Sequence, residues 1–360
     1  MRFLERCDRL IRLRDRAWSL FLVLCREQSG FGDFHLKTTL AIAAADALGL
    51  CDALDRKRKA LRVGLPEGRA SATTLPGKRG GQNSKRLSKL SLETQAIQRE
   101  VQDLLSRLGP YVDLNLEDTL QSFLVRWNHD VQAIAEWELL GPTEAPALEA
   151  DGGLYRDCQL LEPKNKLTFR LNEDDFRDAS LRAGYIGANA YLELASVDIV
   201  SDLILQAWEA QSAHSRGLIS DLGRQLLDEA RHAELLADRA QALGMNLGHV
   251  GVSLHTWHLV RSFPSLAEKL VAQQVIQEGV GLDASALNIL RLARVGDRES
   301  SEVYAQITAD EANHVSLGIR WATRMGRLPL DSLVESVGRK VQEIDPPPDI
   351  PVAVESAASR

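Results

Sequence analysis

Two short segments of the same type stand eighty-two residues apart in this chain. They are Asp228-Glu229-Ala230-Arg231-His232 and Asp310-Glu311-Ala312-Asn313-His314, and each contains a Glu-x-x-His motif preceded by an aspartate. Residues three apart lie on one face of an α-helix, so the carboxylate and the imidazole of each motif project together. Of the eight histidines, only His232 and His314 have a glutamate three residues earlier. The repeated motif therefore predicts two helices that carry metal ligands.

Both motif glutamates, and two others, interrupt apolar stripes with helical spacing. The four stripes are Ile186, Ala190, Glu193, Val197, Val200, Ile204; Leu222, Leu226, Glu229, Ala233, Leu236, Ala240, Leu243; Val271, Val275, Glu278, Leu282; and Tyr304, Ile307, Glu311, His314, Gly318, Trp321, Met325. Each stripe thus places one carboxylate among residues that pack a core.

Burial of four carboxylates needs compensation. An unpaired buried carboxylate costs several kcal/mol, so four of them could outweigh a net folding stability of roughly 5–15 kcal/mol. Two divalent cations would cancel the four negative charges, and neutral imidazoles would add none. A single glutamate in such a stripe is more often a solvated surface residue. The duplicated motif together with two further glutamates favours a dinuclear metal site instead.

The order Glu, Glu-x-x-His, Glu, Glu-x-x-His resembles the ferritin-like di-iron or di-manganese carboxylate proteins, which are four-helix bundles. The resemblance covers about Lys166 to Gly326. It implies that one metal ion is bound by Glu193, Glu229 and His232, and the other by Glu278, Glu311 and His314. It further implies that Glu229 and Glu311 bridge the ions, and that Asp228 and Asp310 each orient the opposite histidine.

Within that superfamily, the segments Gln277–Asp283 and Asp310–Gly318 are similar to a bacterial ferritin-like family of unknown function. That family is distantly akin to the tRNA hydroxylase that acts on an isopentenyl-adenosine side chain. Gly279 and Gly281 indicate that the helix loosens beside Glu278, as at a π-bulge or a helix end. The first half of the chain resembles no family that we can name.

Other chemistry-bearing side chains lie near the motifs. Tyr304 and Trp321 flank the Glu311 motif on its stripe and could line a substrate pocket or carry a radical, although core aromatic residues at this spacing usually serve packing. His255 and His258 stand three apart in the segment Val250–Phe263, which reads as a loop between helices and not as a metal site.

The sequence as a whole predicts an all-α protein. Its 360 residues are 44% hydrophobic and 26% charged, which excludes collagen-like, fully disordered and polytopic membrane classes. No sustained alternation with period two occurs. We expect an N-terminal helical region at 1–140 with a basic loop at about 55–90, a linker at 141–165, a ferritin-like domain at 166–341 and a flexible tail at 342–360.

Charge and cysteine usage favour a cytoplasmic protein without a membrane segment. The four cysteines include no Cys-x-x-Cys pair, and the longest apolar run, Ala17–Cys25, is about half a bilayer span and reads as a buried helix face. The net charge is −7, whereas Asp55–Lys89 contains eleven lysines and arginines against two acids. Nucleic acid could bind only there, and the segment lacks the interleaved aromatic residues of a single-strand platform.

These observations predict a non-haem di-iron or manganese–iron oxidase or oxygenase with Glu229 and Glu311 as catalytic residues. Two iron ions are the expected cofactors, with Mn/Fe and Mn/Mn pairs accepting the same ligands, and O₂ is the oxidant. The expected partners are a small organic substrate and an electron donor, and a homodimer is compatible with this interpretation. One alternative is a ferroxidase, iron-handling or peroxide-scavenging protein. Another is a tRNA-modifying hydroxylase or an RNA-binding module that uses the basic loop.

Overall fold

The computed structural model describes residues 3–28, 31, 33–60, 83–107, 114–140, 159–160, 175–212, 214–247, 251–252 and 255–344. Its helices are α1 (Phe3–Gln28), α2 (Phe34–Ala60), α3 (Asn83–Arg107), α4 (Leu114–Leu140), α5 (Ala179–Glu209), α6 (Ser215–Ala242), α7 (His255–Arg261), α8 (Leu266–Leu270), α9 (Glu278–Arg294), α10 (Arg298–Met325) and α11 (Leu330–Ile344), with a 3-10 turn η1 (Asp175–Arg177) and a π-helix η3 (Val271–Gln277). Two two-residue strands, β1 (Gln159–Leu160) and β2 (Gly251–Val252), pair in parallel. The all-α prediction is confirmed.

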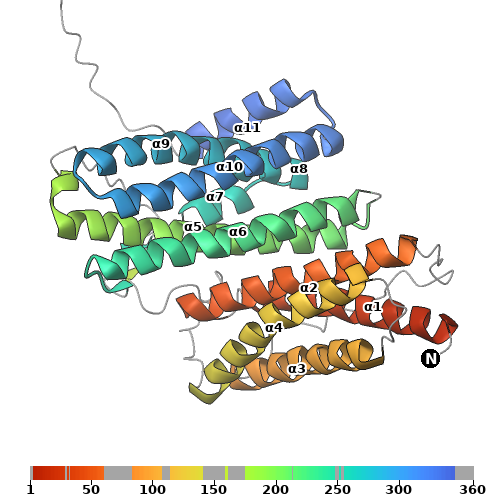
Figure 1. Cartoon of the computed structure of the whole chain (residues 1–360). Coiled ribbons are helices and arrows are strands. Elements are labelled where there is room, and N and C mark those ends of the chain that lie inside the picture. The colour runs from red at the N-terminus through yellow and green to blue at the C-terminus, as the bar shows by residue number, and fades with distance from the viewer. Residues whose placement is uncertain are drawn as a thin grey trace, which may run out of the picture.

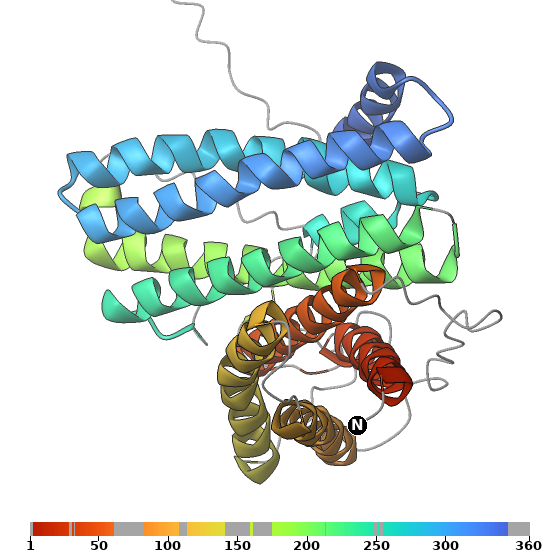
Figure 2. The same ribbon diagram turned by 45° about the vertical axis from the view of Figure 1, so that its right-hand side comes forward.

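The helices form two layers, an upper layer made of α5 to α11 and an N-terminal layer below it made of α1 to α4 (Figures 1 and 2). In one layer, α5 packs against α6, α10 packs against α9 and η3, and α6 contacts α10. In the other layer, α1 pairs with α2 and α3 pairs with α4. The layers meet where α2 packs on α6 and α1 packs on α5. The four stripe-bearing segments therefore lie side by side, and the N-terminal helices cover α5 and α6.

Helix caps and one shared carboxylate fix the relative positions of α5, α6 and α10 at one end of the upper layer. Asp178 caps α5 by accepting hydrogen bonds from the backbone N–H groups of the first turn. Asp297 caps α10 by accepting from the backbone N–H of Ser300 at 3.1 Å. The same carboxylate accepts from Arg182 of α5 at 2.8 Å and from Arg239 of α6 at 2.7 Å. One buried aspartate thus ties three of the helices together.

The N-terminal layer has a core that is continuous with the upper layer. The run Ala17–Cys25 is largely buried, as predicted. Among the described residues, one helical stretch, Phe34–Lys59 of α2, is long and apolar enough to cross a membrane, but 78% of its apolar window is buried inside the fold. Lys37 of α2 and Asp198 of α5 form a fully buried ion pair with an Nζ–Oδ2 distance of 2.6 Å. This burial identifies α2 as a core helix.

The segment predicted as a basic loop is helical at both of its ends. Helix α2 continues to Ala60 and α3 begins at Asn83, so residues 55–60 and 83–89 are helical. The helical pattern persists in both stretches because Arg58 pairs with Asp55 one turn earlier, and because Leu87 is buried. Residues 61–82 lie outside the described residues.

Three further boundaries differ from the predictions. The expected linker contains β1, whose backbone pairs with β2, while the rest of 141–165 lies outside the described residues. His255 and His258 lie on α7 and not in a loop, since Trp257, Leu259 and Val260 give this segment a buried helical face. Helix α11 extends to Ile344, three residues into the expected tail, because buried Val337 keeps it packed on the fold.

Candidate metal centre

The four stripe glutamates and the two motif histidines converge in the interior of the upper layer. Glu229 and His232 of α6 are fully buried, and Glu311 and His314 of α10 are 3% and 2% exposed. Glu278, the first residue of α9, is 8% exposed. These residues are therefore not on the surface, which excludes the solvated-glutamate alternative for them.

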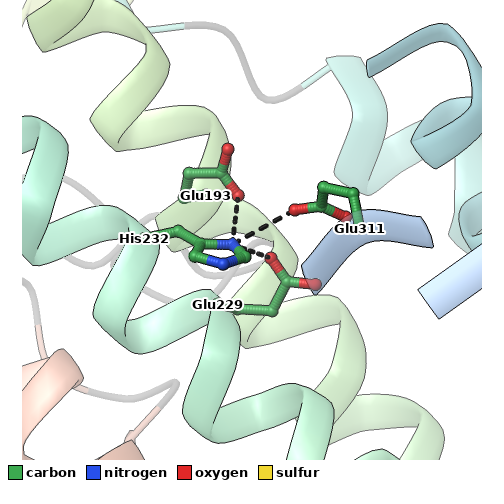
Figure 3. Close-up of side chains that lie close together, drawn as sticks. All are labelled: Glu193, Glu229, His232 and Glu311. Carbon is green, nitrogen blue, oxygen red and sulfur yellow. Dashed lines mark ion pairs between the residues drawn. The ribbon is translucent and has the colours of Figure 1, made fainter. Parts of the chain in front are cut away.

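Glu193 of α5 differs from the other carboxylates in its exposure. Its side chain is 19% exposed, although its stripe neighbours Ala190 and Val197 are buried. Glu193 still points toward His232 in the close-up of Figure 3. It therefore lies at the edge of the cluster, between the core and the surface.

The six side chains fall into two groups that could each hold a metal ion. One group is Glu193, Glu229, His232 and Glu311, and the other is Glu229, Glu278, Glu311 and His314. Within each group the candidate ligand atoms lie within 4.8 Å of one another. Glu229 and Glu311 belong to both groups, so these two carboxylates lie between the two positions.

Distances within each group show how closely the donors approach. Nδ1 of His232 lies 3.1 Å from Oε1 of Glu311, 3.8 Å from Oε2 of Glu193 and 3.9 Å from Oε2 of Glu229 (Figure 3). Nδ1 of His314 lies 2.8 Å from Oε2 of Glu311 and 3.3 Å from Oε1 of Glu229. In both groups the Nδ1 atom faces the carboxylates.

The other ring nitrogen of each histidine faces the aspartate of the opposite motif. Nε2 of His232 lies 3.2 Å from Oδ2 of Asp310, and Nε2 of His314 lies 3.5 Å from Oδ2 of Asp228. An imidazole whose Nε2 carries the proton toward an aspartate presents an unprotonated Nδ1 as a donor. The crossed pairs thus favour the tautomer that a metal ligand needs.

Two glutamines that the sequence analysis did not identify donate hydrogen bonds to carboxylates of the cluster. The side-chain amide of Gln225 donates to Oε1 of Glu229 at 2.8 Å, and that of Gln273 donates to Oε1 of Glu278 at 2.9 Å. Gln274 donates in turn to Gln225 at 2.7 Å. Gln225 precedes its glutamate by four residues, one α-helical turn, which a search for paired polar residues could have found.

The spacing of Gln273 has a different origin. It precedes Glu278 by five residues, which matches the i→i+5 hydrogen-bond spacing of a π-helix, and η3 is π-helical up to Gln277. The prediction that the helix loosens beside Glu278 is confirmed, but the loosened turns precede Glu278 and do not coincide with Gly279 and Gly281. A search at α-helical spacing would not have paired Gln273 with Glu278.

The electrostatics of the cluster reflect burial of like charges. Burial, together with repulsion from neighbouring glutamates, raises the pKa values of Glu229 and Glu278 well above the ordinary range. Burial lowers the pKa of His232, but the carboxylates of Glu193 and Glu311 beside its ring outweigh burial and raise that pKa to about 11. The same balance, with Asp228 and Glu311 as partners, raises the pKa of His314 to about 9. Without metal, the cluster therefore retains protons to offset its charge.

The carboxylate oxygens and imidazole nitrogens of the cluster are better suited to bind divalent cations than to hydrogen-bond with one another. Oε2 of Glu229 and Nδ1 of His232 are buried, and neither has a hydrogen-bond partner. Among the described residues, no lysine or arginine forms an ion pair with the four glutamates. Oxygen and imidazole donors that are buried, close together and incompletely satisfied can bind metal ions.

Tyr304, the candidate pocket residue, lies two turns before Glu311 on α10 and is 3% exposed. Its hydroxyl accepts a hydrogen bond from the side-chain amide of Asn189 on α5. Trp321 lies on the far side of the motif, where its indole N–H donates to Asp221 at 2.8 Å. Of these two aromatic residues, Tyr304 borders the cavity that also touches Glu193 and Glu278.

Comparison with known proteins identifies the family but no characterised relative. No curated protein and no solved structure matches the chain. A family model matches residues 123–341, more than half of the chain, from within α4 to within α11. The matched range contains all six clustered residues. The chain therefore belongs to the family described as protein of unknown function (DUF455).

Proposed function

We propose that the protein is a non-haem dinuclear metal oxidase or oxygenase that uses O₂ to oxidise an organic substrate. The observation that carries the proposal is the sharing of Glu229 and Glu311 by both four-residue groups. Two adjacent ions bridged by carboxylates require such a shared pair. When bound, a pair of iron or manganese ions would bind O₂ and supply two electrons per step.

The six clustered residues would bind the two metal ions as two sets of ligands. In this proposal Glu193, Glu229 and His232 bind one ion, while Glu278, Glu311 and His314 bind the other. Four carboxylates and two divalent cations sum to zero charge, which a buried site can hold without further counterions.

The outer residues fix the orientation of the ligands. Asp310 accepts a hydrogen bond from Nε2–H of His232 at 3.2 Å and so leaves Nδ1 of that ring free to ligate. Asp228 lies 3.5 Å from Nε2 of His314, where its charge favours the same tautomer. Gln225 donates to Oε1 of Glu229 and Gln273 donates to Oε1 of Glu278, and these hydrogen bonds restrict the rotation of the two carboxylates. Such partners lower the reorganisation that metal binding would otherwise require.

A cavity beside the cluster favours oxidation of an organic substrate over the iron-handling alternative. It has a volume of about 160 Å³ and touches Glu193 and Glu278. Iron storage or iron oxidation alone does not need such a space next to the ligands. The RNA alternative depends on residues 61–82, which lie outside the described residues, so the proposal makes no use of it.

Metal content is the first test. Protein produced with both iron and manganese available should contain about two ions per chain. Glu229→Ala or Glu311→Ala should remove a shared ligand and lose both ions, whereas Glu302→Ala, at an exposed position of the same helix α10, should keep both. A Glu229→Ala or Glu311→Ala protein that retains two ions would contradict the bridging assignment.

Oxygen consumption is the second test. Protein loaded with Fe(II) without air should consume O₂ when air is admitted, and the rate should fall in the same variants that lose metal. Absence of O₂ consumption with iron, manganese or both would rule out the oxidase. Uptake of many more iron ions than two per chain would support the iron-handling alternative instead.

A further inference from the structure

Two consecutive glutamines of η3 are connected to different carboxylates of the cluster. Gln273 donates to Oε1 of Glu278 at 2.9 Å. Gln274 contacts α6 instead, where its side-chain amide donates to Oε1 of Gln225 at 2.7 Å. Gln225 in turn donates to Oε1 of Glu229 at 2.8 Å. Gln274 is therefore connected to a carboxylate on another helix through one intervening side chain.

The hydrogen bonds between Gln274, Gln225 and Glu229 are shielded from water. Gln225 is 1% exposed, and Gln274 and Glu229 are fully buried. Since water cannot replace a lost hydrogen bond at such positions, each amide depends on its protein partners. Gln274 is also held at its Cβ atom by the close approach of α10, because a Cβ at Gly318 would lie only 2.4 Å away. The start of the Gln274 side chain is thus fixed by packing.

The chemistry of the three groups gives these hydrogen bonds one direction. A carboxylate that binds metal is ionised and only accepts hydrogen bonds, so Gln225 must present its amide nitrogen to Glu229. Its carbonyl oxygen then faces Gln274, which must donate. If the Gln225 amide turned over, its carbonyl oxygen would face the carboxylate, and two acceptors would meet. The hydrogen bond from Gln274 opposes this rotation because it holds the carbonyl end of Gln225.

The orientation of Glu229 decides which histidine each of its oxygens faces. Oε1 lies 3.3 Å from Nδ1 of His314, and Oε2 lies 3.9 Å from Nδ1 of His232. One oxygen therefore lies on the side of each candidate metal position, as a bridging carboxylate requires. Gln225 donates to Oε1 and so restricts rotation of the carboxylate away from this orientation.

We propose that Gln274 and Gln225 form a hydrogen-bond relay from η3 that keeps Glu229 in its bridging orientation, so that both metal positions depend on Gln274. Gln274 is thus a positioning residue that acts through Gln225. The inference rests on the dinuclear site of the proposed function but not on its O₂ chemistry. Gln273 serves as the control, because its partner Glu278 belongs to only one of the two groups.

The test compares Zn²⁺ binding by full-length variants in competition with a chelator, with elemental analysis of the ions retained. Gln225→Met and Gln274→Met each remove the amide but keep a long unbranched side chain. We expect each to weaken binding of both ions about 10–100-fold, the usual effect of losing a residue that supports a metal ligand. Gln273→Met should mainly weaken the one ion that Glu278 holds. Weakening of a single ion in Gln274→Met, or of none, would overturn the relay.

A double-mutant cycle separates a relay from a purely structural role of Gln274. If Gln274 acts through Gln225, Gln225→Met/Gln274→Met should weaken Zn²⁺ binding no more than Gln225→Met alone. Gln225→Met/Gln273→Met should instead show the sum of the two single effects, since Gln273 acts on another carboxylate. Additive effects of Gln225→Met and Gln274→Met would refute the relay, because a residue that only packs the core acts in either background.

A second variant covers the case in which Gln274→Met folds poorly. Gln274→Asn keeps the amide but shortens the side chain by one methylene, which draws the N–H group back from Gln225. It should weaken both ions as Gln274→Met does, and unweakened binding would count against the relay. The double variant Gln225→Met/Gln274→Met removes both partners of one buried hydrogen bond, which costs less stability than removing one partner.

O₂ consumption is measured separately, so the two proposals can fail independently. The expected pattern of Zn²⁺ binding, without O₂ consumption by the iron-loaded wild type, would sink the oxidase and leave the relay. O₂ consumption together with additive effects in the cycle would sink the relay and leave the oxidase.

Discussion

The contact between α10 and the π-helix offers a quantitative test of the site's geometry. Gly318 of α10, one turn after His314, faces Gln274 of η3. A Cβ atom at Gly318 would lie 2.4 Å from Cβ of Gln274 and 3.3 Å from its backbone carbonyl carbon. Ordinary contact begins at 3.4 Å, so Gly318→Ala requires a separation of 3.4 − 2.4 = 1.0 Å. No rotamer change relieves the clash, because Cβ of Gln274 is fixed to its backbone.

This displacement is large compared with what a metal site tolerates. Metal–ligand distances hold to within about 0.2 Å, so a shift of about 1 Å between α10 and η3 would separate Glu311 and His314 from Glu278. Overpacking of this kind costs about 1–3 kcal/mol. We therefore expect Gly318→Ala to lower both the free energy of unfolding and the metal content.

The matched control is Gly279→Ala. It has the same gain in helix propensity, about 0.5–1 kcal/mol, but a Cβ there meets no atom within 4 Å. The difference between the two variants in denaturant unfolding therefore measures the clash alone, with elemental analysis giving the metal content of each. Equal stability of the two variants, with two ions bound in Gly318→Ala, would refute the close approach of these helices and its role in the site.

Two further predictions concern carboxylates. Asp310→Asn should weaken metal binding about 10–100-fold in competition with a chelator, because the amide cannot replace the carboxylate that polarises His232, whereas Glu302→Gln should not; unchanged affinity would contradict the positioning role. Burial, with the neighbouring carboxylate of Asp46, raises the pKa of Asp130 from 3.8 to about 8. The folded state therefore holds a proton that the unfolded chain has released, and stability falls as pH rises through this window by up to about 1.4 kcal/mol per pH unit. Denaturation at pH 5 to 8 should show a smaller slope for Asp130→Asn but not for the exposed Glu136→Gln; an unchanged slope in Asp130→Asn would refute the burial argument.

The sequence was most informative where one helical period governs both packing and chemistry. Glu229 and Glu311 could be placed in the interior because each replaces an apolar residue in a stripe of constant spacing. Glu193 follows the same rule, yet its side chain is partly exposed, since periodicity fixes the direction of a residue but not what covers it.

The rest of the site depends on features that have no local signature. Gln273 reaches Glu278 only because η3 is π-helical, and the hydrogen bond from Gln274 to Gln225 joins residues 49 positions apart. The pairing of Asp310 with His232 likewise depends on the relative rotation of α6 and α10. Such contacts are set by helix packing, which one sequence does not reveal.

The N-terminal layer contributes to the site although it supplies none of the six clustered residues. Helix α6 carries Glu229 on its inner face, and its outer face receives α2 at Gly223, where a Cβ would lie 2.1 Å from Cδ2 of Leu48 and 3.7 Å from Phe21. That close approach fixes the rotation of α6 about its axis, and the buried Lys37–Asp198 pair does the same for α5. Apolar burial at this interface, at about 25 cal/mol per Å², offsets part of the cost of a polar interior. Helices α1 to α3 precede the range that the family model matches, so the support of the site extends beyond the residues that define the family.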